Sequence, residues 1–454
     1  MQHFLNYLHN NLRKSILAVT GTILLLLLCG LSFSRMAAVP ASTQAAAEIP
    51  ASDDISVDSH TAKSASQNTK AATGQKVPLT GEMRGVWIAF FEYNQKGYTE
   101  SQWKAYVDKT MNDCRAKGFN SVFMHVRAFS DAMYPSKYYP WSRYASGKIG
   151  KNPGFDPLAY AVSAAHKQGL AFHAWINPYR VTKQTTKTSA LAKGSTIYKW
   201  ATSKRSSKRR NVLKYGGQLY LNPASKEVQS LVTNGVAEIV ERYNVDGIHF
   251  DDYFYPALGS QYRKNFDAKE YKSYVKRCKK NKTTAASIVV WRRNNVSKLL
   301  QKIHARIQKI DKDCVFGISP AGNLDNLYAK NNYYADVKKW MNSNQYIDYI
   351  CPQIYWSFKQ SECPYKATAN KWCAIPRHDS VKMYIGIAGY RAGISSSEAR
   401  AIADSSWSKS NTILKRQVQY LRQKQCNGFI LFSNQDLSRA AANKEMQNLR
   451  SILR

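Results

Sequence analysis

Two adjacent carboxylates, Asp251 and Asp252, stand at the end of the short apolar run at residues 246–251. Neighbouring carboxylates repel each other, so one of them keeps its proton to a higher pH than usual. A protonated and an ionised carboxylate together supply the acid–base chemistry that cleavage of an acetal bond requires. The sequence therefore predicts Asp251 as a catalytic group. Asp252 is its predicted catalytic partner, with orienting Asp251 or binding a sugar as the other roles open to it.

Other side chains able to contact a substrate stand near the ends of similar apolar runs. Alternate residues of a strand point to the same face, so one face of each run can be written out. If these faces line the inside of a barrel, their polar and aromatic side chains gather at one end of it. The inward sets are Phe123, His125 and Arg127; His173, Trp175 and Asn177; His249 and Asp251; and Cys351, Gln353 and Tyr355.

These side chains differ in what they can do. Arg127 can clamp a carboxylate or a sugar hydroxyl, or form a salt bridge that orients Asp251. We expect His173 to contact substrate, and we keep His249 in the predicted site with a structural role favoured. The other predicted substrate contacts offer hydrogen bonds or flat faces for sugar rings: Trp87, Asp131, Trp175, Asn177, Tyr179, Gln353, Tyr355 and Trp356.

The apolar runs recur along the chain in a regular pattern. Eight of them, bounded by turn signals, lie at residues 85–91, 121–127, 170–177, 246–251, 315–320, 349–355, 382–388 and 428–433. Segments with helical periodicity separate them, for example residues 157–168, 226–243, 286–310 and 396–403. Strands alternating with helices in this way predict an α/β fold, the (β/α)8 TIM barrel. No Gly-x-Gly-x-x-Gly motif follows the first run, which argues against a dinucleotide-binding fold.

The chain before residue 81 has a different character. Residues 15–34 form an uncharged apolar run long enough for a ~30 Å hydrocarbon core, and Arg13 and Lys14 precede it. Residues 1–35 are therefore predicted to be a transmembrane anchor or a cleaved signal peptide. The composition of residues 36–80 predicts a disordered, flexible linker. The barrel is then expected at residues 81–454, outside the cytoplasm, either anchored to the cell membrane or secreted.

The composition of the 454-residue chain bears on its partners. Lys and Arg number 66 against 30 acids, a formal charge of +36, and an apolar content of 44% excludes a fully disordered chain. So basic a protein is expected near a polyanion, which can be nucleic acid, an anionic membrane surface or an anionic wall polymer. An extracytoplasmic location argues against nucleic acid. The sequence leaves the oligomeric state open.

Part of the positive charge is concentrated in one segment. The basic run at residues 204–210 lies within residues 183–217, which we predict to be a long loop over the barrel mouth. Such a run is usually a solvated face, but it can also attract an anionic glycan.

The eight cysteines show no CxxC spacing, so neither a zinc ribbon nor a redox motif is predicted. Cys363 and Cys373 are close enough in sequence to form a disulfide in an oxidising compartment. No third ligand at a fixed spacing makes a metal site of Asp251 and Asp252. We therefore expect neither a metal nor a cofactor.

Several blocks of the chain resemble one known family. The run VDGIHFDDYFYP at residues 245–256 resembles the signature of the glycosyl-hydrolase-like family 10 proteins, which are distinct from the family 10 xylanases. Other blocks agree in order between about residues 83 and 450, among them MRGVW at 83–87, HAWINPYRV at 173–181, WRRNNV at 291–296 and YICPQIYW at 349–356. The departures are the basic run at 204–210 and Cys351 within the last of these blocks.

The resemblance implies a TIM barrel that acts on bacterial cell-envelope glycans. Some members of the family resemble hydrolases of peptidoglycan glycan strands, and others are related to the barrel that cleaves partly deacetylated poly-N-acetylglucosamine. For this chain it implies a secreted or membrane-tethered glycoside hydrolase with a polysaccharide substrate. The alternative interpretation is a glycan-binding barrel without catalysis.

Overall fold

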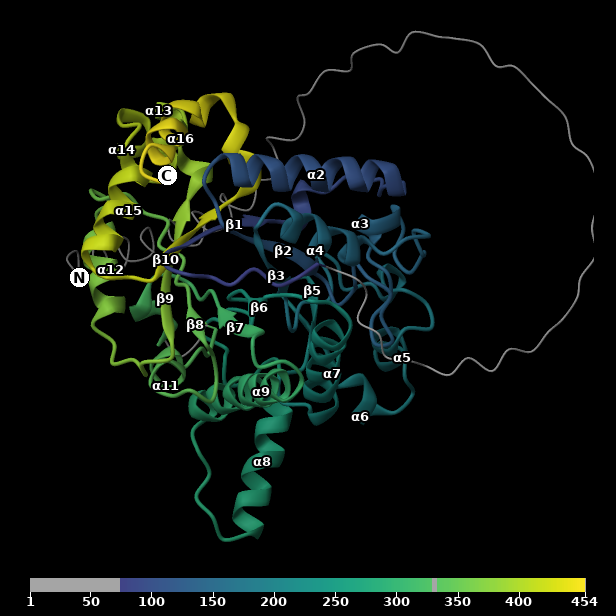
Figure 1. Ribbon diagram of the computed structural model, residues 1–454. Coiled ribbons are helices and arrows are strands. Elements are labelled where there is room, and N and C mark those ends of the chain that lie inside the picture. Colours follow the sequence, from purple (N-terminus) through teal and green to yellow (C-terminus); the bar gives the residue numbers. More distant parts are fainter. Residues whose placement is uncertain (1–73, 329–332, 454) are drawn as a thin grey trace, which may run out of the picture. The chain divides into compact units, whose positions relative to one another are not determined.

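The computed structural model describes residues 74–328 and 333–453. Within these residues, eight parallel strands close into a barrel in the order β1, β2, β3, β6, β7, β8, β9, β10, with helices around it (Figure 1). The strands are Met83–Ile88 (β1), Ser121–Arg127 (β2), Ala171–Ile176 (β3), Gly247–Phe250 (β6), Val315–Ile318 (β7), Tyr349–Ile350 (β8), Lys382–Ala388 (β9) and Gly428–Phe432 (β10). Each predicted strand is present, so the predicted barrel is confirmed.

The predicted helices are confirmed as α4 (Pro157–Lys167), α7 (Lys226–Arg242), α9 (Ile288–Ile310) and α13 (Ser396–Ala401). Side-chain caps fix where several helices begin; Ser225 accepts from the backbone N–H of Val228 at the start of α7. Further helices are α2 (Glu100–Ala116), α3 (Arg143–Ser146), α5 (Thr196–Ala201), α6 (Ser206–Arg209), α8 (Ala268–Lys280), α10 (Leu324–Leu327), α11 (Val337–Met341), α12 (Tyr365–Cys373), α14 (Ser406–Lys409), α15 (Ile413–Gln423) and α16 (Asn443–Arg450). Short 3₁₀ helices are η1 (Phe90–Glu92), η2 (Thr188–Ala190), η3 (Gly389–Arg391), η4 (Asn434–Ser438) and η5 (Ala440–Ala442).

The predicted anchor or signal at residues 1–35 lies outside the described residues, as does the predicted linker up to residue 73. None of the helices in the described ranges has the length and apolar content that a membrane span needs.

The barrel separates two apolar layers, and the alternation along its strands decides which side chains enter each. Apolar residues such as Val122, Phe172 and Ile248 pack outward against the helices. The interior is largely aromatic and contains Met83, Trp87, Ala89, Phe123, Trp175, Tyr349, Cys351, Tyr384 and Ile430. The period-2 prediction of inward and outward faces therefore holds for most strands.

Two glycines make room for the rings inside the barrel. A Cβ atom at Gly247 would lie 2.3 Å from the His173 ring, and one at Gly317 would lie 2.1 Å from the Tyr349 ring. Any larger residue at these two positions would displace an interior ring. Gly247 on β6 and Gly317 on β7 thus leave space inside the barrel for the rings of His173 on β3 and Tyr349 on β8.

The segment predicted as a long loop, residues 183–217, is partly regular. It contains η2, α5, α6 and the strand β4 (Val212–Tyr215), which pairs with β5 (Gln218–Leu221) as an antiparallel hairpin. Gly216 and Gly217 turn this hairpin with φ angles of 52° and 74°. The basic run is also engaged, since Lys208 pairs with Glu227 and Arg210 with Glu270.

A buried ion pair fastens the loop after β6 to the outer helices. The Nε and Nη2 atoms of Arg292 donate to Oδ1 of Asp267 at 2.8 and 2.7 Å, and both side chains are fully buried. The hydroxyl of Tyr255, which follows β6, donates to the other oxygen of Asp267 at 2.7 Å. The pair therefore holds the segment that carries Asp251 against α9.

We expect Arg292→Met to lower the free energy of unfolding by about 3–5 kcal/mol, because it leaves the charge of Asp267 buried without a partner. Urea denaturation followed by tryptophan fluorescence measures this loss. Arg293→Met is the matched control, since Arg293 is half-buried and lies over the Tyr328 ring without an ion pair in the described structure. Equal losses for the two variants would contradict the assignment.

Candidate active site

The predicted carboxylate pair lies at the carboxyl-terminal end of the barrel, where β6 ends. Asp251 is buried, with 3% of its surface exposed, and Asp252 is half-buried. Both line a cavity of about 180 Å³. This end of a TIM barrel is the end at which enzymes of this fold carry their active sites.

Three neighbours donate hydrogen bonds to Asp251. The indole Nε1 of Trp175 donates to Oδ2 at 3.2 Å, and the backbone N–H of Tyr253 donates to Oδ1 at 3.3 Å. The amide of Asn177, oriented with its nitrogen toward the carboxylate, places Nδ2 at 2.5 Å from Oδ1 and 2.9 Å from Oδ2. These donors from β3 and the loops fix the direction in which the carboxyl group points.

His125 accounts for the orientation of the Asn177 amide. The backbone N–H of Phe90 donates to Nδ1 of His125 at 3.4 Å, so the ring carries its proton on Nε2. The facing amide atom of Asn177 lies 3.4 Å from that Nε2. It is therefore the amide oxygen, which accepts from His125 and leaves the nitrogen to donate to Asp251. The His125 ring also stacks on Trp175, with ring centroids 3.4 Å apart.

Burial raises the pKa of both carboxyl groups. Loss of solvent is the largest cause for Asp251, and the negative charge of Asp252 adds to it, so the pKa of Asp251 lies well above its usual range. Burial also raises the pKa of Asp252 to about 6, against the lowering effect of Arg180. Burial and the charge of its neighbour thus favour the protonated form of Asp251 more strongly than burial alone favours that of Asp252.

Arg180 is the cation beside this pair. Its guanidinium carbon lies 4.7 Å from the centroid of the Phe129 ring and 4.6 Å from that of Tyr253, so the two rings hold it in place. Its charge lowers the pKa of both Asp251 and Asp252. Arg180 itself lines the cavity, which places a positively charged side chain in its wall.

Aromatic rings form much of the remaining wall of the cavity. The predicted residues that line it are Trp87, Trp175, Asn177, Asp251, Asp252, Gln353 and Tyr355. The lining also includes Phe90, Phe91, His125, Arg180, Tyr253, Ser319 and Phe432. A cavity with flat rings around a carboxylate pair suits a sugar ring, whose apolar faces stack on aromatic side chains.

The two predicted histidines lie deeper in the barrel and do not line the cavity. His249 accepts from Nε1 of Trp87 at 3.1 Å, and its other ring nitrogen lies 2.9 Å from the Tyr349 hydroxyl. His173 stacks on Phe123 at a centroid distance of 4.3 Å. Both are fully buried, and burial lowers the pKa of each. His249 thus supports Trp87 in the cavity wall, and His173, predicted to contact substrate, lies outside the lining.

Arg127 points away from the cavity, contrary to the alternation prediction. The register of β2 against β3 shifts between His125 and Arg127, so Arg127 pairs with the outward-facing Ile176. Its guanidinium carbon lies 4.2 Å from the centroid of the Tyr139 ring, and a Cβ atom on Gly235 of α7 would come within 2.5 Å of its Nη1. The irregularity turns the side chain outward, so Arg127, predicted to contact substrate or Asp251, is not among the residues that line the cavity.

Three more predicted contacts lie outside the cavity. Asp131 is buried and accepts from the backbone N–H of Phe129 at 3.1 Å, which makes it a loop-stabilising residue. Tyr179 is fully buried in the outer core. Trp356 is half-buried, and its ring packs close to Gly322. Each follows a strand end in sequence, but none of the three lines the cavity.

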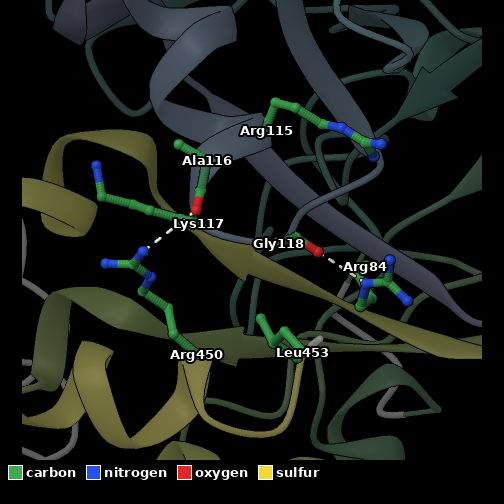
Figure 2. Close-up of a pocket in the computed structure, with 7 residues that line it drawn as sticks. All are labelled: Arg84, Arg115, Ala116, Lys117, Gly118, Arg450 and Leu453. Carbon is green, nitrogen blue, oxygen red and sulfur yellow. Dashed lines mark hydrogen bonds between the residues drawn. The ribbon is translucent and has the colours of Figure 1, made fainter.

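A second cavity, of about 380 Å³, lies at the amino-terminal end of the barrel and is lined with cations (Figure 2). Arg84 donates from Nε to the carbonyl of Gly118 at 2.7 Å, and Arg450 donates to the carbonyl of Ala116 at 3.2 Å. Helix α2 ends at Ala116, where unpaired carbonyls favour nearby cations. The described residues that line this cavity include no carboxylate, so it does not offer the acid–base chemistry found at the barrel mouth.

A TIM barrel with a carboxylate pair and aromatic walls at its mouth has the groups that a glycoside hydrolase needs. The chain matches the family model described as Glycosyl hydrolase-like 10 over residues 82–407. It therefore belongs to the glycosyl hydrolase-like 10 family, and the resemblance seen in the sequence is confirmed.

Similar proteins agree with this assignment. Glycosyl hydrolase DigH of Escherichia coli (strain K12) is 35% identical over 350 residues, which cover 70% of this chain and 77% of that protein. Glycosyl hydrolase YngK of Bacillus subtilis (strain 168) is 35% identical over 332 residues, which cover 68% of this chain and 61% of YngK. The catalytic domain of β-amylase from Paenibacillus polymyxa is similar with a TM-score of 0.50 at 12% identity, covering 85% of this chain and 100% of that one. This last similarity shows the shared fold alone.

Proposed function

We propose that the protein hydrolyses glycosidic bonds in a bacterial cell-envelope glycan, either peptidoglycan strands or a poly-N-acetylglucosamine-like polymer. The observation that carries the proposal is the pair Asp251 and Asp252, which line an aromatic cavity at the carboxyl-terminal end of the barrel; the pKa of each carboxyl group is raised by burial. Asp251 donates its proton to the oxygen of the leaving sugar. Asp252, ionised above a pH of about 6, either attacks the sugar carbon as a nucleophile or acts as the base that takes a proton from the attacking water.

A sugar unit enters with its apolar faces against Trp87, Trp175 and Tyr355. Asn177 and Trp175 hold the Asp251 carboxyl group toward the scissile bond, and Arg180 faces the same space. The cationic side chain of Arg180 in the cavity wall suits an acceptor on the glycan, such as a carboxylate or an amide oxygen. This arrangement favours N-acetylated or acidic sugars.

An extracytoplasmic location is part of the proposal. The uncharged apolar run at residues 15–34 and the linker composition of residues 36–80 support a barrel that is tethered to the membrane or secreted. The formal charge of +36 supports a location beside an anionic wall polymer or membrane surface.

Product release from defined glycans tests the proposal. Purified full-length protein is incubated with intact peptidoglycan, with peptide-free strands and with partly deacetylated poly-N-acetylglucosamine, and products are read by mass spectrometry. We expect oligosaccharides from at least one of these with the wild type and none with Asp251→Asn. Binding to a glycan without any product would favour the catalytically silent barrel instead.

We expect Arg180→Met to shift the pH dependence of hydrolysis. In the wild type, kcat/KM rises as Asp252 ionises through a pH of about 6. Because Arg180 lowers the pKa of Asp252, removing its charge raises that pKa, and the rise in activity moves to higher pH by about one unit. Profiles of kcat/KM between pH 4 and 9 measure the shift. The reference variant is Arg143→Met, at the start of α3 and outside the cavity lining, which should leave the profile in place.

A further inference from the structure

Two cysteines that were not paired from sequence spacing meet at the amino-terminal end of the barrel. Cys373 ends α12, and Cys426 lies between α15 and β10, and their Sγ atoms are 3.7 Å apart. The partner predicted for Cys373 was Cys363. The sulfur of Cys363 instead accepts from Nδ2 of Asn323 at 3.2 Å. The fold therefore favours a different pairing from the one that sequence proximity suggested.

Hydrogen bonds hold in place the two segments that carry these thiols. The hydroxyl of Tyr420 on α15 donates to the Asn370 side chain on α12 at 2.7 Å, which ties the two helices side by side (Figure 1). Asn427, next to Cys426, donates to the carbonyl of Met383 at 2.8 Å, and its side chain accepts from the N–H of Met383 at 2.9 Å. Closing the two sulfurs to a bond length of about 2.05 Å then requires side-chain rotation and a small adjustment of local backbone.

The surroundings of the pair favour reaction. Cys373 is exposed and Cys426 is half-buried, and both line a cavity of about 330 Å³ that also contains Arg377 and Lys424. A hydrogen bond from the Cys426 thiol, aided by these two cations, lowers the pKa of Cys373 to about 7. The same contact raises the pKa of Cys426. Cys373 is thus the more readily ionised thiol of the two, with a resolving thiol beside it.

Three buried cysteines do not compete for this role, and neither does a metal site among the described residues. Cys114, Cys314 and Cys351 are fully buried, and burial raises the pKa of each thiol. In residues 74–328 and 333–453, no group of three or more His, Cys, Asp and Glu side chains is arranged to hold a metal ion.

We propose that Cys373 and Cys426 are a site of disulfide formation that joins α12 to the segment entering β10. The reaction needs a disulfide oxidant, such as oxidised glutathione or a thiol–disulfide oxidoreductase. The Cys373 thiolate attacks one sulfur of the oxidant, forming a mixed disulfide and releasing one thiol. Cys426 loses its proton to solvent and attacks Sγ of Cys373, which releases the second thiol. The two protein thiols lose two electrons and two protons, and the oxidant gains them. This proposal does not rest on the proposed function.

Tryptic mapping tests the pairing on the full-length protein. Cleavage after Lys and Arg places Cys363, Cys373 and Cys426 in separate peptides, residues 360–366, 372–377 and 425–439. After treatment of the reduced protein with oxidised glutathione and blocking of free thiols, we expect peptides 372–377 and 425–439 joined, two hydrogens lighter than their sum. The link should persist in Cys363→Ser. In Cys426→Ser, Cys373 should retain glutathione as a mixed disulfide.

A link between 360–366 and 372–377, separate glutathione adducts on Cys373 and Cys426 of the wild type, or unreacted thiols at both positions would each overturn the proposal. The bond joins two cysteines that are 53 residues apart in sequence. Because it closes a loop of this length, oxidation should raise the Tm of the wild type by about 5 °C. Cys426→Ser should show no such rise, which separates the effect of the bond from other effects of the oxidant.

Discussion

Asp251→Asn should lower kcat on a cell-envelope glycan about 10³-fold while leaving the affinity for the glycan nearly unchanged. A positioned general acid typically contributes 10²–10⁴-fold to a rate, roughly the range expected when its proton is lost. The amide is nearly isosteric with the carboxyl group, and its oxygen can still accept from Trp175 or Tyr253. Steady-state kinetics on the glycan, with binding measured by calorimetry, separate loss of turnover from loss of affinity.

Comparing substrates with good and poor leaving groups tests whether Asp251 is the proton donor. An aryl glycoside with a good leaving group needs no proton, so Asp251→Asn should lose much less activity on it than on the unactivated glycan. Asp131→Asn is the matched control, because Asp131 is also a buried carboxylate after a strand but does not line the cavity. An equal loss on both substrates would reassign the proton donor to Asp252.

The barrel was predictable because its signal is repeated. Each strand is a buried apolar run, and eight of them alternating with helices leave few other folds. The hairpin of β4 and β5 was missed because its strands are only four residues each, within a basic polar segment. The pair Gly216 and Gly217 carried the available signal, since two adjacent glycines suit a tight hairpin turn.

Site residues were predictable where side chains alternate regularly along a strand, and not in the loops or past a break in register. Asp251, Trp175 and Asn177 come from regular strands or from the residue next to them, and the cavity contains all three. Arg127 lies beyond a break in register, which a strict alternation cannot anticipate. Arg180 was missed because it lies in the loop after β3, where no periodicity says which way a side chain points. Its place in the HAWINPYRV block was the one signal available.

A large loss of activity is also expected when the Asn177 side chain is removed. Its contact with His125 orients the amide so that the nitrogen donates to Asp251. Asn177→Ala removes a donor that favours the ionised carboxyl group, so the pKa of Asp251 rises and the group becomes a poorer acid. It also frees the carboxyl group to rotate. We expect kcat to fall about 10²-fold with little change in KM, as for loss of a preorganised donor. The fall in activity at high pH, where Asp251 loses its proton, should move to higher pH.

His125→Phe should reproduce this loss, because the phenyl ring can still stack on Trp175 but cannot fix the Asn177 amide. Burial holds the pKa of His125 well below its usual range, so the ring stays neutral and acts through position alone. If His125 acts through Asn177, the double variant should be no slower than Asn177→Ala by itself. Multiplied losses in the double variant would show that the two residues act independently, and an unshifted high-pH limb in both single variants would mean that neither one sets the pKa of Asp251.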